Sequence, residues 1–297
     1  MLPYTVYSEA GGVGKTTLAA NLAVAHARAG LDVLVIPLDP QDGDLSHLFD
    51  IDHDRADADA DHIVRHLVER EKGPFDDLIH HDIDHPGVDI IPEHNMLDDL
   101  EDVLQREADS RSDFGESFPK YTQLLRVLRE NEVNEEYDVV IMDPQASPGA
   151  GVYNAIAASG NLVLPIEPSA KGQASVNGLE DLVSGLSEQL EIGVGVLAAV
   201  PNGFSGTNDQ TEILEAVRDL GYDVPVVFRQ RSSLFEGCWR QNCSAFTYVR
   251  EHRDRQRDHE METLAKFDEL ARHIERQGGI EAPNPPEPGE VEELAEV

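Results

Sequence analysis

The stretch "SEAGGVGKTT", residues 8–17, decides how the rest of the chain is interpreted. Its end follows the phosphate-binding pattern Gly-x-x-x-x-Gly-Lys-Ser/Thr, but Glu9 occupies the position of the first glycine. Gly11, Gly12 and Gly14 allow the backbone to curl so that successive N–H groups point inward, and such a nest before a helix favours phosphate. A glycine-rich turn without a ligand is the alternative. The Gly-Lys-Thr-Thr sequence between a strand and a helix favours the phosphate site.

The side chains of this stretch are suited to binding a triphosphate and its metal ion. Lys15 would place its ammonium on the β- and γ-phosphates, and Thr16 would offer its hydroxyl to Mg²⁺. We therefore expect ATP and Mg²⁺ as cofactors. The nucleotide-binding residues predicted from the loop are Gly11, Gly12, Val13, Gly14, Lys15, Thr16 and Thr17.

The flanking sequence predicts a strand–loop–helix–strand unit. "YTVYS" precedes the loop, an apolar helical pattern follows it up to Gly30, and "DVLVIPLD" reads as a buried strand that ends in Asp39. Similar strands follow at residues 87–92, 137–143, 160–168, 193–202 and 224–230, with helical patterns such as 118–131, 209–221 and 259–279. This alternation predicts an α/β fold of the P-loop NTPase type, a mostly parallel twisted sheet flanked by helices on both faces.

Composition limits the class of protein. The chain has 297 residues with 40% hydrophobic content, which suffices for a sizeable core, and it has no apolar run long enough to span a membrane. We expect one ATPase domain at residues 1–279 and an acidic, Pro-rich disordered tail at residues 280–297. Two cysteines and no signal segment favour the cytoplasm.

The net charge of −35 is the unusual bulk property. It is typical of a halophilic surface, because concentrated salt screens the self-repulsion of the folded chain. An acidic interaction surface is the alternative. Non-specific nucleic-acid binding is disfavoured by the average charge, although a local basic patch remains compatible with it.

Several motifs together resemble the ParA/MinD group of partition and positioning ATPases. Members carry the variant loop Lys-Gly-Gly-x-Gly-Lys-Thr, which reads Ala10 to Thr16 here. "LDPQDGD" at residues 38–44 looks like switch I of the group, and "YDVVIMDPQASPG" at residues 137–149 looks like its Walker B strand and switch II. "VDIIPEHNML" and "LVLPIEP" are similar to further strands of the group, so that the resemblance spans most of residues 4–279.

The resemblance implies roles for particular residues. Asp39 would polarise the attacking water or hold it through Mg²⁺, and Asp143 would support the ion from its second shell. In relatives the ends of the last two strands flank the adenine, which points here to Asn202 and to Phe228 or Arg229 as a stacking group. The implied reaction is slow ATP hydrolysis in a nucleotide-sandwich homodimer.

The signature lysine of the group falls on Ala10. The protein therefore dimerises with slow or no hydrolysis, binds nucleotide as a monomer, or uses a cation from elsewhere. We favour the last reading, with Lys171 in "EPSAKGQASVNG" as the catalytic replacement, since some relatives that position protein compartments use a lysine from this later region. Arg229 and Arg231 are further candidates.

The acidic tail excludes the basic membrane helix of MinD-type members. Basic residues concentrate at 225–276, which hold ten Lys or Arg and nine Asp or Glu. The candidate contacts for non-specific DNA, and hence for nucleoid association, are Arg229, Arg231, Arg250, Arg253, Arg255 and Arg257. Ion pairs on a solvated helix are the equally weighted alternative, and a ParB-like, adaptor or cargo protein is a partner of at least equal weight.

Two other patterns give weaker evidence for a functional site. Cys238 and Cys243 have neither the Cys-x-x-Cys nor the widely separated spacing used for iron–sulfur clusters in the superfamily. His62 and His66 share a helical face without an obvious third metal ligand, so an exposed polar insertion is the expected structure. The predicted function is a partition or positioning ATPase for a DNA or protein cargo. A redox or cluster-transfer ATPase of the same superfamily and a nucleotide-gated scaffold without turnover are the alternatives.

Overall fold

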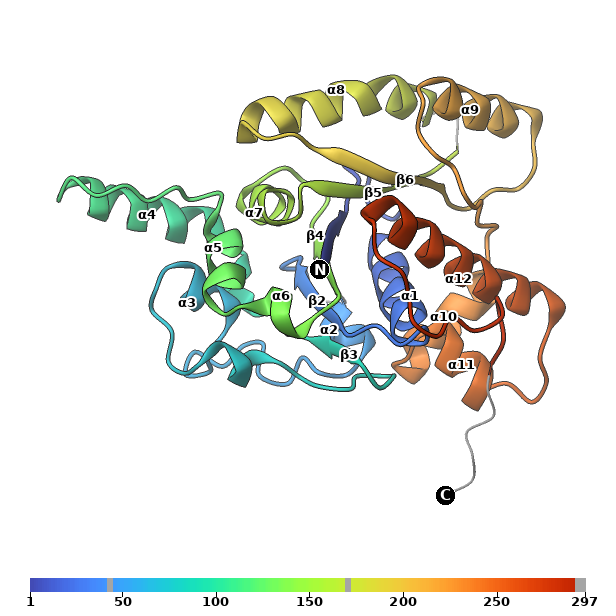
Figure 1. Cartoon of the computed structure of the whole chain (residues 1–297), viewed down its shortest axis with the longest axis horizontal. Helices are drawn as coiled ribbons and strands as arrows, with labels where there is room; N and C mark the ends of the chain where they lie inside the picture. The colour runs from blue at the N-terminus through green and yellow to red at the C-terminus, as the bar shows by residue number, and fades with distance from the viewer. Residues whose placement is uncertain (42–44, 169–171, 292–297) are drawn as a thin grey trace.

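The sheet at the centre of the molecule is entirely parallel. The computed structural model describes residues 1–41, 45–168 and 172–291, with backbone alone for 172–177 and 179. In this part of the chain six strands are ordered β3-β2-β4-β1-β5-β6 (Figure 1). They are β1 (Leu2–Val6), β2 (Val33–Leu38), β3 (Val88–Ile90), β4 (Val139–Pro144), β5 (Asn161–Ile166) and β6 (Gly195–Pro201). The predicted α/β class is confirmed.

Helices cover both faces of this sheet (Figure 1). They are α1 (Lys15–Ala27), α2 (Leu45–Leu48), α3 (Ile63–Leu67), α4 (Leu100–Ser112), α5 (Gln123–Glu130), α6 (Val133–Glu136), α7 (Ala150–Ser159), α8 (Gly172–Leu190), α9 (Asn208–Asp219), α10 (Ser232–Gln241), α11 (Ala245–Glu251) and α12 (Asp258–Gly278), with 3₁₀ turns η1 (Phe75–Leu78) and η2 (Asn95–Leu97). No helix within the described ranges is both long and apolar enough to cross a bilayer.

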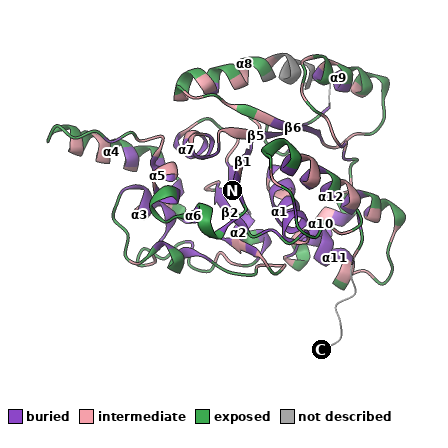
Figure 2. Cartoon of the chain, in the orientation of Figure 1, coloured by how far each residue is buried: buried purple, intermediate pink, exposed green. Residues whose placement is uncertain are grey.

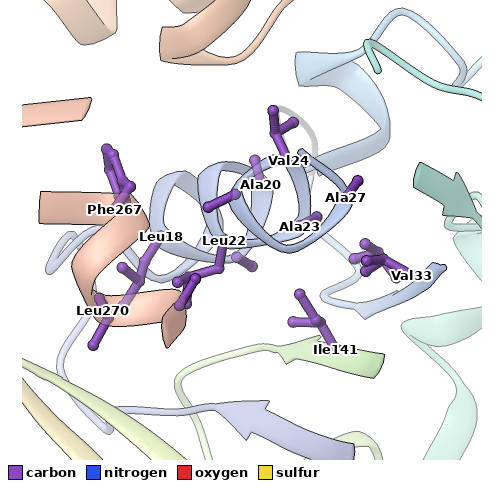
Figure 3. Packing of buried hydrophobic residues seen from close by; sticks show 14 of the residues in the cluster. Leu18, Ala20, Leu22, Ala23, Val24, Ala27, Val33, Ile141, Phe267 and Leu270 are labelled. Carbon is purple, nitrogen blue, oxygen red and sulfur yellow. The ribbon is translucent and has the colours of Figure 1, made fainter. Parts of the chain in front are cut away.

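Alternating residues of a strand pack into different hydrophobic cores on the two faces of the sheet. Val33 and Val35 of β2 join the core that packs under α1, α11 and α12, whereas Leu34 and Ile36 face α3, α4, α5 and α7. Figure 3 shows Leu18 of α1 beside Phe267 and Leu270 of α12. Burial on both faces explains the continuous apolar runs of these strands, and it is strongest in the sheet and α1 (Figure 2).

A buried polar network crosses the first of these cores. The Tyr4 hydroxyl lies 3.1 Å from His26 Nε2, and His26 Nδ1 lies 2.6 Å from Glu275 Oε1. Arg272 donates two hydrogen bonds to the same carboxylate. Because His26 is fully buried, burial lowers its pKa, against the opposing influence of Glu275. The network joins β1, α1 and α12 in one hydrogen-bonded unit.

The predicted strand at residues 224–230 is not formed. Only one isolated bridge, between Phe204 and Arg229, occurs there. The segment still lies beside β6, because Ala199 N–H donates to the Asp223 carbonyl and Phe228 N–H donates to the Pro201 carbonyl. Pro225 has no N–H to donate, which interrupts a ladder at this position.

The first part of the predicted disordered tail is packed. Asn284 N–H donates to the Ala29 carbonyl at 2.9 Å, and Gly289 N–H donates to Asp268 Oδ2 at 2.8 Å. A Cβ on Gly289 would lie 2.8 Å from the Met261 carbonyl, so the chain approaches α12 closely. Residues 280–291 therefore extend the domain, and residues 292–297 lie outside the described part.

Candidate nucleotide-binding site

The glycine-rich loop lies at the carboxyl end of β1 and leads directly into α1. Gly12 and Gly14 adopt φ angles of 75° and 89°, which side chains larger than hydrogen rarely tolerate. A Cβ on Gly11 or Gly12 would meet no atom within 4 Å, so the space beside these two residues is open. Lys15 is the first residue of α1 and is 8% exposed. This open nest before a helix N-terminus fits the phosphates of a nucleotide.

Asn202 holds the loop from the neighbouring strand. It follows β6, and its Nδ2 donates a 2.8 Å hydrogen bond to the Val13 carbonyl. A Cβ on Gly14 would lie 2.5 Å from the same amide nitrogen. The sequence predicted Asn202 beside the base. The structure places its side chain on the loop backbone, a contact that no local pattern announces.

Asp39 and Asp143 lie at the same edge of the sheet. In the β2–β4 register Pro37 pairs with Asp143 and Leu38 with Pro144, so Asp39 follows one residue past the paired ends. Asp143 is 1% exposed, whereas Asp39 is partly exposed and accepts a 3.1 Å bond from the Gln41 N–H. Thr16, in the first turn of α1, lies at the same edge. Oxygen ligands in such an arrangement suit Mg²⁺ directly or through water.

Two cavities adjoin the loop. A narrow one of about 20 Å³ reaches the core beside Gly14 and Thr17, and an open one of about 370 Å³ extends along Gly12, Glu167 and Arg231. Phe235 of α10 lines both cavities and is only partly buried. Phe235 was not predicted as a site residue, because it stands in a helix that no motif of the group marks.

The two residues predicted to stack on the base, Phe228 and Arg229, do not line the open cavity. Phe228 is 3% exposed, and its ring centroid lies 4.6 Å from that of Phe267, so the ring belongs to the core, where it lines the narrow cavity. Arg229 is exposed, and it does not line either cavity beside the loop. The aromatic group available at this edge is Phe235.

The position of the missing lysine is exposed. Ala10 N–H donates to Ser8 Oγ at 3.3 Å, and the alanine carries no charge. Arg231 lines the open cavity with Gly12, but its Nε donates to the His259 carbonyl at 3.1 Å and its Nη2 lies 3.5 Å from Glu262. Lys171 lies outside the described residues.

Most arginines of the predicted DNA patch form ion pairs. Arg253 donates two bonds to Glu260, which is 1% exposed, and Arg257 lies 3.7 Å from the same carboxylate. Arg250 pairs with Glu251 at 2.8 Å, and Arg231 is held as described above. Arg229 and Arg255 are exposed and form no ion pair within the described part of the chain. These pairs match the alternative of local ion pairs more closely than a free phosphate-binding surface.

His62 and His66 are buried rather than part of an exposed insertion, although neighbouring residues such as His53 and Asp54 are exposed. His62 and His66 are each 6% exposed, and the His62 ring stacks on His94 at 3.9 Å with an interplanar angle of 8°. His66 Nε2 lies 3.1 Å from Asp61 Oδ2. Burial, with a further contribution from His94, lowers the pKa of His62 to about 3, so this imidazole is neutral.

The two cysteines lie in the core. Cys238 and Cys243 are each 4% exposed, and burial raises the pKa of the Cys243 thiol to about 12. Protonated, buried thiols are poor metal ligands. This arrangement gives the cluster-transfer alternative no support from the described residues.

Comparisons with known proteins place the chain among nucleotide-dependent ATPases. Residues 4–192 match the family described as an AAA domain (AAA_31). The chromosome-partitioning ATPase Soj of Thermus thermophilus is 30% identical over 209 residues, which cover 69% of this chain and 72% of Soj.

Solved structures agree with the fold. The septum site-determining protein MinD of Pyrococcus horikoshii, complexed with Mg-ADP, superposes with a TM-score of 0.67 at 18% identity, covering 94% of this chain and 97% of MinD. A complex of Cyanothece McdA with ATP gives a TM-score of 0.69 at 18% identity, covering 95% and 97% of the two chains.

Proposed function

The chain belongs to the ParA/MinD/Soj family of P-loop ATPases (AAA_31), and we propose that it is a partition or positioning ATPase that dimerises on MgATP and hydrolyses it slowly. Its cargo would be DNA or a protein assembly, as the name of the Thermus relative suggests for chromosomes. The observation that carries this proposal is the open glycine loop ending in Lys15, at the sheet edge where Asp39 and Asp143 end adjacent strands.

Different groups of the chain would bind the phosphates, hold the metal ion and orient the attacking water. Backbone N–H groups of residues 11–17 and the Lys15 ammonium would hold the β- and γ-phosphates. Thr16 would ligate Mg²⁺, and Asp39 and Asp143 would hold it directly or through water. The bound ion would neutralise charge on the phosphate oxygens. Asp39, partly exposed at the loop after β2, would orient the attacking water.

A second cation would complete the site in the dimer. We propose Lys171 for this role, with Arg231 as the candidate among the described residues, because Arg231 lines the same cavity as Gly12 and Gly14. For Arg231 to reach a partner's phosphate, it must leave Glu262, the His259 carbonyl and the Thr263 hydroxyl. Loss of the partly exposed ion pair with Glu262 alone costs about 0–1 kcal/mol.

The adenine would lie in the open cavity against Phe235 and Asn202, whose side chain also holds the loop. A cytoplasmic protein partner is a better-supported matrix than DNA, because Arg250, Arg253 and Arg257 already neutralise carboxylates. Arg229 and Arg255 are the arginines left for DNA.

Calorimetry in concentrated KCl with Mg²⁺ tests the proposal, since a chain of charge −35 is expected to fold best in salt. Wild type should bind ATP, and Lys15→Ala should weaken binding by about 100-fold, roughly 2.7 kcal/mol. Identical heats from the two proteins would refute the nucleotide site. Light scattering with ATP should show a dimer.

Steady-state hydrolysis separates the enzyme from a scaffold. Wild type should release phosphate slowly, with stimulation by its partner. ATP-dependent dimers without phosphate release above a Lys15→Ala blank would favour the nucleotide-gated scaffold instead. Lys171→Ala should lower turnover while ATP binding stays, and normal turnover in that variant would move the role to Arg231.

A further inference from the structure

A third cavity lies away from the nucleotide edge, between residues 56–70 and α4. Its volume is about 450 Å³, within the range of about 300–1,000 Å³ typical of small-molecule sites. Its apolar lining comes from Val64, Val68, Met96 and Val103. Figure 1 shows α3 and α4 on the same side of the sheet, far from α12. The cavity therefore does not belong to the loop site.

Two polar side chains in this cavity have hydrogen-bonding capacity to spare. Within the described residues His62, 94% buried, has no hydrogen-bond partner at Nδ1. Its neighbour His94 is fully engaged: Nδ1 accepts from the Met96 N–H, and Nε2 donates to the Asp57 carbonyl. Arg65 donates to the Ala58 carbonyl at 3.2 Å, while its buried Nε has no partner in the same described part.

The lining of this cavity is more basic than acidic, although the chain as a whole is strongly acidic. The protein has 58 acidic and 23 basic residues, yet Arg65 and Arg70 line the cavity with Asp99 as its one carboxylate. Arg70 pairs with Glu107 at 2.8 Å, which leaves Arg65 as the cation without an ion pair among the described residues. Arg65 is partly exposed, but its buried Nε has no partner among the described residues, and a bound carboxylate or phosphate would accept a hydrogen bond from it.

We propose that this cavity binds a small organic anion with an apolar body. The anionic head would accept hydrogen bonds from Arg65 and from the N–H of the neutral His62 imidazole. The body would lie against the valines and Met96. Arg65 supplies the charge selectivity, and the aliphatic walls supply the size selectivity.

The cavity is connected to the loop that carries Asp39. Asn95, in its lining, accepts a 2.9 Å hydrogen bond from Arg55 Nε, and Arg55 Nη2 donates to the Pro40 carbonyl. Occupancy would thus act on the residue next to Asp39 through one side chain. This regulatory part rests on the proposed function, whereas binding itself does not.

Octanoate serves as the probe, titrated calorimetrically into nucleotide-free protein. We expect saturable binding at one site, loss of at least about tenfold in affinity in Arg65→Met, and no loss in Arg240→Met, which changes an exposed arginine on α10. Methionine preserves most of the apolar stem, so folding should survive. Acetate and octylammonium should not bind. Equal octanoate affinity in the two variants, or equal binding of octylammonium, would overturn the site.

Two further measurements test where octanoate binds and whether its binding affects hydrolysis. The imidazole nitrogen resonances of His62 should shift with octanoate, while those of exposed His259 should not; unchanged His62 resonances contradict the assignment. Phosphate release should change with octanoate in wild type and not in Arg65→Met. Binding without that change retains the site and rejects the coupling to Asp39. Binding without any hydrolysis retains the site and rejects the proposed enzyme.

Discussion

The loop at residues 8–17 and the segment at residues 51–99 both adjoin the Asp39 loop, but they are built differently. The first is specified within ten residues, by glycines whose positive φ angles shape the backbone. The second depends on contacts between distant residues, such as His62 with His94 and Arg55 with Asn95. Local motifs therefore reveal the first region, whereas only the folded chain reveals that His62 and His94 of the second are buried and line a cavity.

The largest expected effect is on turnover at the loop edge. Asp39→Asn should lower phosphate release by about 10²–10⁴-fold, because a group that positions or polarises the attacking water contributes that much. ATP affinity should change by less than about threefold, since the phosphates are held by residues 11–17. Asp54→Asn, an exposed aspartate in the other region, is the matched control for single-turnover kinetics. Equal losses of phosphate release in both variants would contradict a specific role of Asp39 in hydrolysis.

The next effect is on folding in the second region. Leu67 is fully buried, and Leu67→Ala should destabilise the protein by about 2–5 kcal/mol through lost burial and a new cavity. Denaturant unfolding measures this change. ATP affinity of the folded variant should match wild type, because Leu67 belongs to a core on the face opposite α1. A large fall in ATP affinity would show that the two regions are one unit.

Gly14→Ala should weaken ATP binding by about 100-fold, roughly 2.7 kcal/mol. The added Cβ would meet Asn202 Nδ2 at 2.5 Å, at a residue with a φ of 89°. Gly221→Ala is the matched control, because Gly221 has a φ of 85° and open space around its Cβ position. The control should lose only about 1 kcal/mol of stability and keep its ATP affinity, measured calorimetrically.

The smallest effect concerns pH. Folded His62 stays neutral down to about pH 3, whereas the unfolded chain protonates it near 6.5. Protons therefore favour unfolding, and this loss of stability grows as the pH falls below 6.5. His62→Gln should remove about 2 kcal/mol of the decline between pH 7 and 5, measured by denaturant unfolding. His259→Gln, at an exposed position, should retain the full decline; the same curve for both variants contradicts a buried neutral His62.

The parts predicted from sequence are those encoded locally. The buried strands ending in Asp39 and Asp143 and the turn before Lys15 have periodicity or glycine patterns of their own, and they were predicted at the right edge of the sheet. The structure corrected interpretations that depend on tertiary contacts. Phe228 packs on Phe267, from α12, and Pro225 prevents the seventh strand. The position of Phe228 depends on a residue of a distant helix, whereas Pro225 stands inside the predicted strand itself.

The bond between His26 and Glu275 has a consequence for synthesis of the chain. Its partners are separated by 249 residues, and α1 also packs on α12. The amino-terminal half, although it contains the phosphate loop and both aspartates, leaves the ribosome without the helix that covers α1. At about 5–20 residues per second, that interval lasts on the order of ten seconds or more. During this time the apolar side of α1 is a natural target for chaperones.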